Sequence, residues 1–197
     1  MKLSVNWLSE WTTVDKSIDD LCDALTMAGL EVDGVEELGE GLEGVVIGRV
    51  EEREQHPNAD KLSVCQVTDG EVTQTVVCGA PNVAAGQHVA YARPGATLPN
   101  GMTLKVAKLR GIESHGMLCS AAELALGEGA DGIMVLADDA PLGQALVDYL
   151  KLNDHVIDID LTPNRGDCLS VLGIAREVAV LTDQPAPQAI DINDMII

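Results

Sequence analysis

The chain offers few residues whose types and spacing would support catalysis. Its four histidines are scattered, and no pair among its five cysteines has the spacing of a zinc site. The GxSxG, Walker and HExxH motifs of common enzyme classes are absent from the sequence. His115 and Cys119 come nearest to a nucleophile with its base, but a buried thiol near a loop histidine explains them better. We therefore expect neither a catalytic residue nor a metal site in these 197 residues.

A cluster of basic residues has instead the chemistry of a phosphate-binding surface. Lys105, Lys108 and Arg110 fall within six positions, and Lys61 follows a loop that begins at His56. Neutralisation of phosphates by such side chains supplies most nucleic-acid affinity. On a regular strand Lys108 and Arg110 would share a face, with Lys105 on the other. An edge strand protected by charges explains the cluster equally well. The same segment holds neutral donors suited to phosphate and ribose: Asn58, Asn82, Ser114 and Ser120.

Charge and aromatic content limit the kind of binding. The chain has a net charge of −20, and residues 40–150 alone carry 7 basic and 15 acidic side chains. Aromatic residues make up 2% of the chain, and residues 40–150 contain only Tyr91 and Tyr149. A single-strand binder that stacks bases, at roughly 1–3 kcal/mol per base, is therefore disfavoured. Recognition of folded RNA through its shape and backbone remains as the expected kind of binding. DNA is not expected as a partner.

The cysteine content and the hydropathy of the chain indicate its cellular compartment. The five cysteines are widely spaced and odd in number, which is typical of reduced thiols. The sequence has no apolar run of signal-peptide type and none long enough to span a bilayer. We expect a cytoplasmic protein without a membrane partner.

The first segment, residues 1–39, has the pattern of a capped helix followed by a strand. Ser17 is a suitable N-cap, and apolar residues recur with helical periodicity from Ile18 to Leu25. Gly29 stands where a C-terminal glycine cap belongs. Residues 30–38 are strand-like. A segment this short buries little apolar surface, so it needs a partner.

Short strand-like runs, separated by Gly, Pro and Asn, dominate the middle of the chain. They lie at residues 45–52, 62–68, 73–78, 88–92, 103–109 and 132–136. Many short strands with this punctuation predict a small barrel or sandwich with an aliphatic core. Short helices are expected near residues 121–126 and 144–150.

The pattern changes again after residue 150. Residues 154–161 alternate, and a solvated strand face explains Asp158 and Asp160 better than acid–base chemistry does. Turn residues fill positions 162–168, and a helix is expected from about Asp167 to Leu181.

Each flank therefore holds one strand and one helix, and neither is sufficient alone. The economical solution pairs both flanks into one discontinuous α/β domain with the small barrel inserted between them, which is tolerated where the ends of the insert lie close together. The expected fold class is thus mixed β and α/β. The expected parts are residues 1–39 and 151–190 for the α/β domain, 40–150 for the barrel, and 191–197 for the start of a linker or next domain.

Longer strings in the middle segment resemble the tRNA-binding OB-fold domain of several aminoacyl-tRNA synthetases and free tRNA-binding proteins. They are HPNADKL at residues 56–62, VCGAPN at 77–82, PGATLPNG at 94–101 and KLRGIESHGMLCS at 108–120. The flanks carry WLSEW at 7–11, TMAGLEVD at 26–33 and DLTPNRGDCLSVLGIAREVA at 160–179. These resemble the β-subunit family of bacterial phenylalanyl-tRNA synthetases, and the resemblance covers essentially the whole chain.

The resemblance implies an N-terminal fragment of a much longer β subunit, whose first domain is interrupted by the OB-fold barrel. It implies part of an ATP-dependent class II ligase that attaches phenylalanine to its tRNA in protein synthesis, as two α and two β subunits. Catalysis would belong to the α subunit, and the β-subunit magnesium ligands, editing site and anticodon-binding domain would lie beyond Ile197. The fragment itself would be non-catalytic and without cofactor, whereas the full enzyme would use ATP and magnesium. The resemblance makes these residues candidate RNA contacts: Lys61, Asn82, Lys105, Lys108, Arg110 and Ser114.

Two alternatives stay open at this point. A protein-interaction scaffold would keep the barrel but use it for subunit packing, in agreement with its negative charge. An autonomous tRNA chaperone would not need the split flanking domain. Binding of tRNA that depends on salt concentration separates the leading hypothesis from the scaffold.

Overall fold

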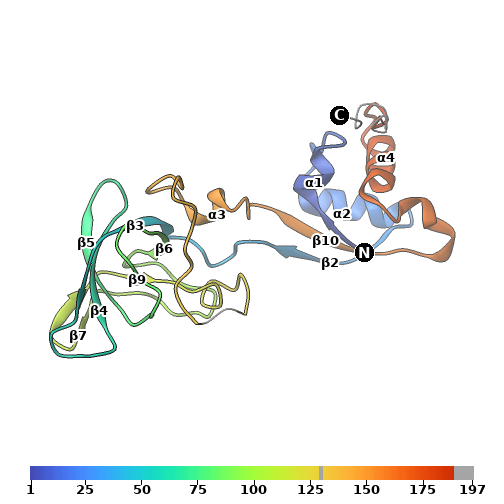
Figure 1. Ribbon diagram of the computed structural model, residues 1–197. Coiled ribbons are helices and arrows are strands. Elements are labelled where there is room, and N and C mark those ends of the chain that lie inside the picture. Colours follow the sequence, from blue (N-terminus) through green and yellow to red (C-terminus); the bar gives the residue numbers. More distant parts are fainter. Residues whose placement is uncertain (129–130, 189–197) are drawn as a thin grey trace. The chain divides into compact units, whose positions relative to one another are not determined.

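The computed structural model describes residues 1–128 and 131–188. This part of the chain divides into two compact units, residues 39–152 and residues 1–38 with 153–188 (Figure 1). The boundaries lie one and two residues from those expected from the sequence. We call residues 39–152 the barrel unit and the other residues the flanking unit. The segment expected at residues 191–197 lies outside the described residues.

A five-stranded antiparallel sheet forms most of the barrel unit. Its strands are neighbours in the order β5 (Thr73–Cys78), β4 (Ser63–Thr68), β3 (Val45–Gln55), β6 (His88–Ala92) and β9 (Met117–Leu118). The long strand β3 pairs with β6 through its first half and with β4 through its second. The β3–β4 register shifts between Val50 and Glu52, and such bulges bend a strand and help a sheet to curl.

The sheet curls until its two edges meet. His115 donates its backbone N–H to the Thr75 carbonyl at 2.8 Å, and Val77 donates its N–H to Ser114 Oγ at 3.0 Å. These bonds join β5 to the segment that leads into β9. The result is a nearly closed OB-type barrel, and the expected fold class is confirmed.

Buried and less buried residues alternate along the barrel strands, and the buried ones form the aliphatic core. On β4, Ser63, Cys65 and Val67 are buried and their neighbours are half-buried. Strand β6 is buried on both faces, so Tyr91 packs in the barrel core while Ala90 packs in a second apolar layer. The short helix α3 (Leu146–Tyr149) belongs to this second layer.

The barrel unit differs from expectation around the basic cluster. Instead of a strand over residues 103–109, Thr103 makes an isolated β-bridge with Thr97, and Ala107–Leu109 (β7) pairs in a hairpin with β8 (Ile112–Ser114). Arg110 and Gly111 form its two-residue turn with φ of 48° and 100°. The prediction that Lys108 and Arg110 share a strand face was therefore wrong, because Arg110 lies beyond the end of the strand.

Two further elements expected in this unit are weaker than predicted. Residues 121–126 form turns rather than a helix, and residues 132–136 contribute a single β-bridge, between Val135 and Val89. The backbone bonds of residues 121–126 are local turn bonds, whereas residues 132–136 bond to the backbone of His88, Ala90 and Cys119.

In the flanking unit, a three-stranded antiparallel sheet carries helices on one side (Figure 1). The strands lie in the order β1 (Lys2–Ser4), β10 (His155–Asp160) and β2 (Glu31–Glu37). The helices are α1 (Val5–Ser9), α2 (Ile18–Met27) and α4 (Val171–Leu181). Ile157 and Ile159 of β10 are fully buried with Leu25 and Ile174 of the helices. The two segments thus share one core.

Helix ends agree with the sequence at α2 and differ at α4. Ser17 Oγ accepts the Asp20 N–H at 3.2 Å, and Gly29 follows the helix at a φ of 85°. Helix α4 begins at Val171 rather than near Asp167, because a 3₁₀ helix, η1 (Pro163–Cys168), precedes it. At Gly173 any Cβ would lie 2.0 Å from the Asp167 carbonyl oxygen, so this close approach of η1 to α4 requires glycine.

Candidate functional site

Exposed cations lie on and just before the β7–β8 hairpin. Lys108 is on β7, Arg110 is in the turn, and Lys105 lies in the irregular stretch that leads into β7; all three are exposed. We call these three residues the hairpin cations. None of them forms an ion pair with another residue in the described part of the chain. Their charges are therefore available to an outside anion.

Loop 56–62 holds the hairpin in place through a buried histidine. The His56 side chain is 2% exposed, its Nδ1 accepts the Asn58 N–H at 3.1 Å, and its Nε2 lies 3.2 Å from the Leu109 carbonyl oxygen. Because Nδ1 accepts, the ring proton belongs on Nε2, which donates to Leu109. Asn58 Nδ2 also donates to the Arg110 carbonyl at 3.4 Å. The loop thus fastens the hairpin where β7 ends and its turn begins.

Loop 56–62 is itself held by the end of β3. Gln55 Nε2 donates to three loop carbonyls, those of Ala59, Asp60 and Leu62, at 3.1, 3.1 and 3.0 Å. Lys61 stands exposed between the last two of these residues. Its backbone position is therefore fixed before any ligand arrives, which reduces the ordering cost of binding.

Asn82 and Ser114 are used inside the barrel unit. Asn82 makes two bonds of 2.9 Å with the backbone of Ile133, through Nδ2 and Oδ1. Ser114 is 3% exposed, accepts the Val77 N–H at 3.0 Å and donates to the Gly116 carbonyl at 3.1 Å. These contacts give both residues a structural task, so the six expected contacts comprise four exposed cations and two residues bonded within the barrel unit, of which Asn82 is also exposed.

Arg53 is a surface cation that the sequence reasoning missed. It lies near the end of β3, two residues before Gln55, and its Nε donates to Ser63 Oγ at 3.0 Å. A hollow of about 420 Å³ opens between loop 56–62 and residues 79–81, and Arg53 and Lys61 both line it. The alternation of Arg53 and Gln55 at the end of β3 was a signal that could have found it.

The remaining basic residues between positions 40 and 150 are neutralised. Arg49 Nε donates to Glu51 at 2.8 Å, and Arg93 Nε donates to Asp69 at 2.9 Å. Burial alone would raise the pKa of Asp69, but the Val72 and Glu71 N–H groups and the Arg93 guanidinium outweigh it and lower that pKa below its usual range. These pairs are structural.

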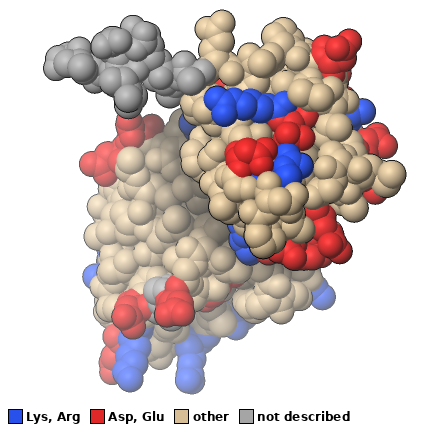
Figure 2. All heavy atoms as spheres, turned by 90° about the vertical axis from the view of Figure 1, so that its right-hand side faces the viewer, with Lys and Arg blue, Asp and Glu red and all other residues tan. Residues whose placement is uncertain are grey.

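Acidic side chains are otherwise widespread. On the face shown in Figure 2 they are scattered over the surface, and basic side chains are fewer. A polyanion would meet a repulsive field over most of such a surface. The exposed cations of the barrel unit are therefore a local exception in a chain with a net charge of −20.

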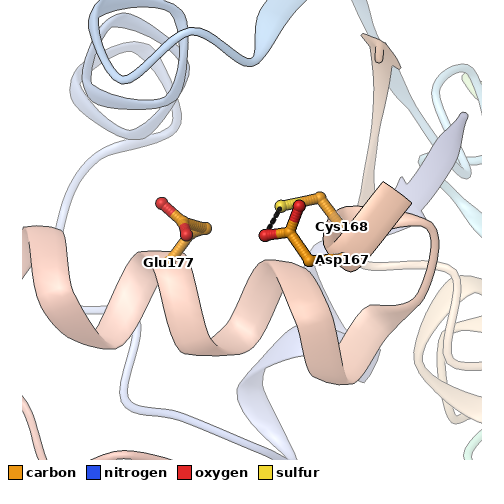
Figure 3. A group of neighbouring side chains, drawn as sticks. All are labelled: Asp167, Cys168 and Glu177. Atoms are coloured by element: carbon orange, nitrogen blue, oxygen red, sulfur yellow. Dashed lines mark hydrogen bonds between the residues drawn. The ribbon is translucent and has the colours of Figure 1, made fainter. Parts of the chain in front are cut away.

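In the flanking unit, Asp167, Cys168 and Glu177 converge from η1 and α4 (Figure 3), and their ligand atoms lie within 4.8 Å of one another. The Arg165 guanidinium already holds them, since its Nη2 lies 3.2 Å from Asp167, 2.8 Å from Glu177 and 2.9 Å from Cys168 Sγ. Burial and the bond to Asp167 raise the pKa of the Cys168 thiol to about 11. A protonated thiol beside a fixed guanidinium disfavours a metal ion, so this cluster ties η1 to α4.

The fold and the site together define a class: an OB-type β-barrel that carries exposed cations on a hydrogen-bonded hairpin and an adjoining loop, without ion pairs among the described residues. Residues 45–145 match the family described as "Putative tRNA binding domain". The chain belongs to this family.

Similarity to individual proteins extends over almost the whole chain. The phenylalanine–tRNA ligase beta subunit of Hahella chejuensis is 55% identical over 185 residues, which cover 94% of this chain and 23% of that protein. Beta subunits of Pseudomonas syringae pv. syringae and Syntrophus aciditrophicus are 58% and 50% identical over 92% and 94% of this chain. The chain thus spans about a quarter of the length of these curated relatives.

Among solved structures, the C-terminal domain of Plasmodium vivax p43 matches 50% of this chain with 26% identity and a TM-score of 0.37. The match covers 56% of that chain. Within the residues that the structure describes, no helix is both long and apolar enough to cross a membrane.

Proposed function

We propose that the chain is the tRNA-binding N-terminal part of a phenylalanine–tRNA ligase β subunit, and that the barrel unit holds tRNA through the hairpin cations and Lys61. The observation that carries this proposal is a set of four exposed cations that form no ion pair with any described residue, on two segments joined by hydrogen bonds, within a matched tRNA-binding family. Backbone phosphates are the part of RNA that such cations recognise. Asn82 and Ser114 would then support the surface rather than touch RNA.

The whole enzyme proposed for this chain is an ATP- and magnesium-dependent class II ligase of two α and two β subunits, acting in the cytoplasm on the phenylalanine-specific tRNA. The similarity to beta subunits over 94% of the chain supports this assignment. In it, residues 39–152 are the tRNA-holding domain, and the flanking unit is one domain built from two segments. The chemistry of aminoacylation belongs to residues outside this chain.

A second candidate function is a scaffold that packs against other subunits without touching RNA. The acidic excess of residues 40–150, with 15 acidic against 7 basic side chains, is the observation that favours it. The scaffold predicts no change in tRNA binding with salt, whereas phosphate contacts predict a strong one.

Titration of the chain with tRNA and with a plain hairpin RNA at 50, 100 and 200 mM salt tests the proposal. Four phosphate contacts correspond to a slope of about −3.6 in the logarithm of the association constant against the logarithm of salt concentration. Binding of that steepness, stronger for tRNA than for the hairpin, supports a tRNA-holding barrel. Absence of a tRNA-dependent signal at 50 mM salt supports the scaffold.

A further inference from the structure

We propose that the hollow between loop 56–62 and residues 79–81 seats one backbone phosphodiester of the bound RNA, held by Arg53 and Lys61. This inference rests on the proposed function and adds a defined phosphate position to it. It also assigns a role to Arg53, which lies outside the basic cluster of the hairpin.

Strand geometry directs Arg53 into the hollow. Arg53 pairs with Cys65 and Gln55 pairs with Ser63, so these four side chains share one face of the β3–β4 ladder. Glu54 pairs with Val64 on the other face. Glu52 pairs with Gln66 on that same other face, so both acidic neighbours of Arg53 in sequence are turned away from the hollow.

The guanidinium of Arg53 is anchored through one edge. Its Nε donates to Ser63 Oγ at 3.0 Å, and Ser63 is 4% exposed, so the anchor belongs to the packed barrel. Arginine presents five N–H donors in a fixed fork that suits phosphate oxygens. Arg53 forms no ion pair within residues 1–128 and 131–188, which leaves the terminal nitrogens of the fork for a ligand.

The charge of the hollow fits a diester. Arg53, Lys61 and Asp60 are its ionisable lining residues, so its net charge is about one positive unit. A phosphodiester in an RNA backbone carries one negative charge. A free phosphate or phosphomonoester, with close to two negative charges at neutral pH, would leave the occupied hollow with an excess negative charge, whereas a diester neutralises it.

The opposite wall suits a close approach by a backbone. Gly79, Ala80 and Pro81 line it, and none of them has a bulky or charged side chain. Loop 56–62 carries both Lys61 and the residues that hold the hairpin, so the same RNA segment can lie along the hollow and reach the hairpin cations. The phosphate position is thus continuous with the surface proposed above.

Arg53→Gln tests the assignment, with Arg49→Gln as the matched control on the same strand, because Arg49 is bonded to Glu51 and does not line the hollow. Both variants are titrated with tRNA at 50, 100 and 200 mM salt, after thermal unfolding has shown that they fold. One lost duplex phosphate contact lowers the salt slope by about 0.9. By the same relation Arg53→Gln binds about 15-fold more weakly at 50 mM and about 4-fold more weakly at 200 mM, while Arg49→Gln binds like the wild type.

A folded Arg53→Gln chain with unchanged affinity and slope overturns the phosphate position but leaves the proposed function standing. An equal loss of tRNA affinity in Arg49→Gln also overturns it, because the loss would then follow from removing any positive charge on this strand. Wild-type chain that shows no salt-dependent tRNA binding overturns the proposed function itself. Inorganic phosphate is titrated separately, and saturable binding below 1 mM that Arg53→Gln abolishes would assign the hollow to a free anion instead.

Discussion

Replacement of His56 tests whether loop 56–62 organises the RNA-binding surface. The ring makes two hydrogen bonds at a site that is 2% exposed, one with the Asn58 N–H and one with the Leu109 carbonyl. His56→Leu removes both bonds, and the freed groups belong to Asn58 and Leu109, two exposed residues that water can reach. Each bond contributes about 0.5–1.5 kcal/mol, so we expect the free energy of unfolding of the barrel unit to fall by about 1–3 kcal/mol.

Two further variants separate the bonds. In His56→Gln the side-chain amide reaches the position of Nε2 and can still donate to Leu109, whereas in His56→Asn the shorter amide can still accept from Asn58. Of the two bonds of His56, only the one to Leu109 joins the loop to the hairpin directly. We therefore expect the amides of β7 and β8 to exchange faster in His56→Asn and His56→Leu than in His56→Gln.

Binding of tRNA should follow the same order. A released hairpin must be ordered again by the RNA, and each bond contributes about 1 kcal/mol to the ordered state. The affinity should then fall about fivefold when one bond is lost and about thirtyfold when both are lost. Filter binding at 100 mM salt measures this, with His155→Leu in the flanking unit as a control that should not change. Equal affinity in folded His56→Leu and wild-type chains would refute the reasoning, as would a His56→Gln variant no better than His56→Leu.

Three other measurements check separate parts of the structure. Lys108→Glu with Arg110→Glu should lower the salt slope of tRNA binding by about two and the affinity at 50 mM by about two-hundredfold, without a loss of thermal stability; Lys16→Glu should do neither. Because the pKa of Asp69 is lowered in the folded chain, its contribution to stability is present at neutral pH and is lost as pH falls below the ordinary aspartate pKa of about 3.9. Urea unfolding from pH 6 to pH 3 should therefore be less pH-dependent in Asp69→Asn, and an identical pH dependence contradicts the assigned pair. Ellman's reagent at pH 8 should modify one thiol of the native chain quickly, that of the half-buried Cys22, and the four buried thiols only after unfolding; a fast phase that survives in Cys22→Ser would show that a buried thiol is accessible.

Elements with a local signal were predictable from the sequence. The Ser17 cap and the Gly29 terminus of α2 depend on residues within a few positions, and so does the alternation of β4 and β10. Turn residues marked the ends of the barrel strands, because Pro restricts the local φ angle and Gly permits φ angles that other residues avoid. The fold class followed from these patterns together.

The site was less predictable because its decisive contacts join residues far apart in the sequence. His56 meets Leu109 across 53 positions, Asn82 meets Ile133 across 51, and Ser114 meets Val77 across 37. The residue type of a histidine, an asparagine or a serine does not indicate a hydrogen-bond partner so far away in the sequence. The start of α4 was missed for a similar reason, since the close approach of Gly173 to Asp167 depends on the three-dimensional course of η1.

The arrangement of β2 and β10 has a mechanical consequence. The chain leaves the flanking unit after Leu38 and returns at Asn153, and Leu38 donates its N–H to the Asp154 carbonyl at 2.9 Å. Both connections to the barrel unit therefore leave from the same end of one antiparallel pair, which continues with Glu37 opposite His155. A force that draws the two connections apart would load this ladder one hydrogen-bonded pair at a time, as in unzipping, rather than in shear. The flanking unit would thus yield to tension first at Leu38 and Asp154, while its helices and the β1–β10 pairing remain intact.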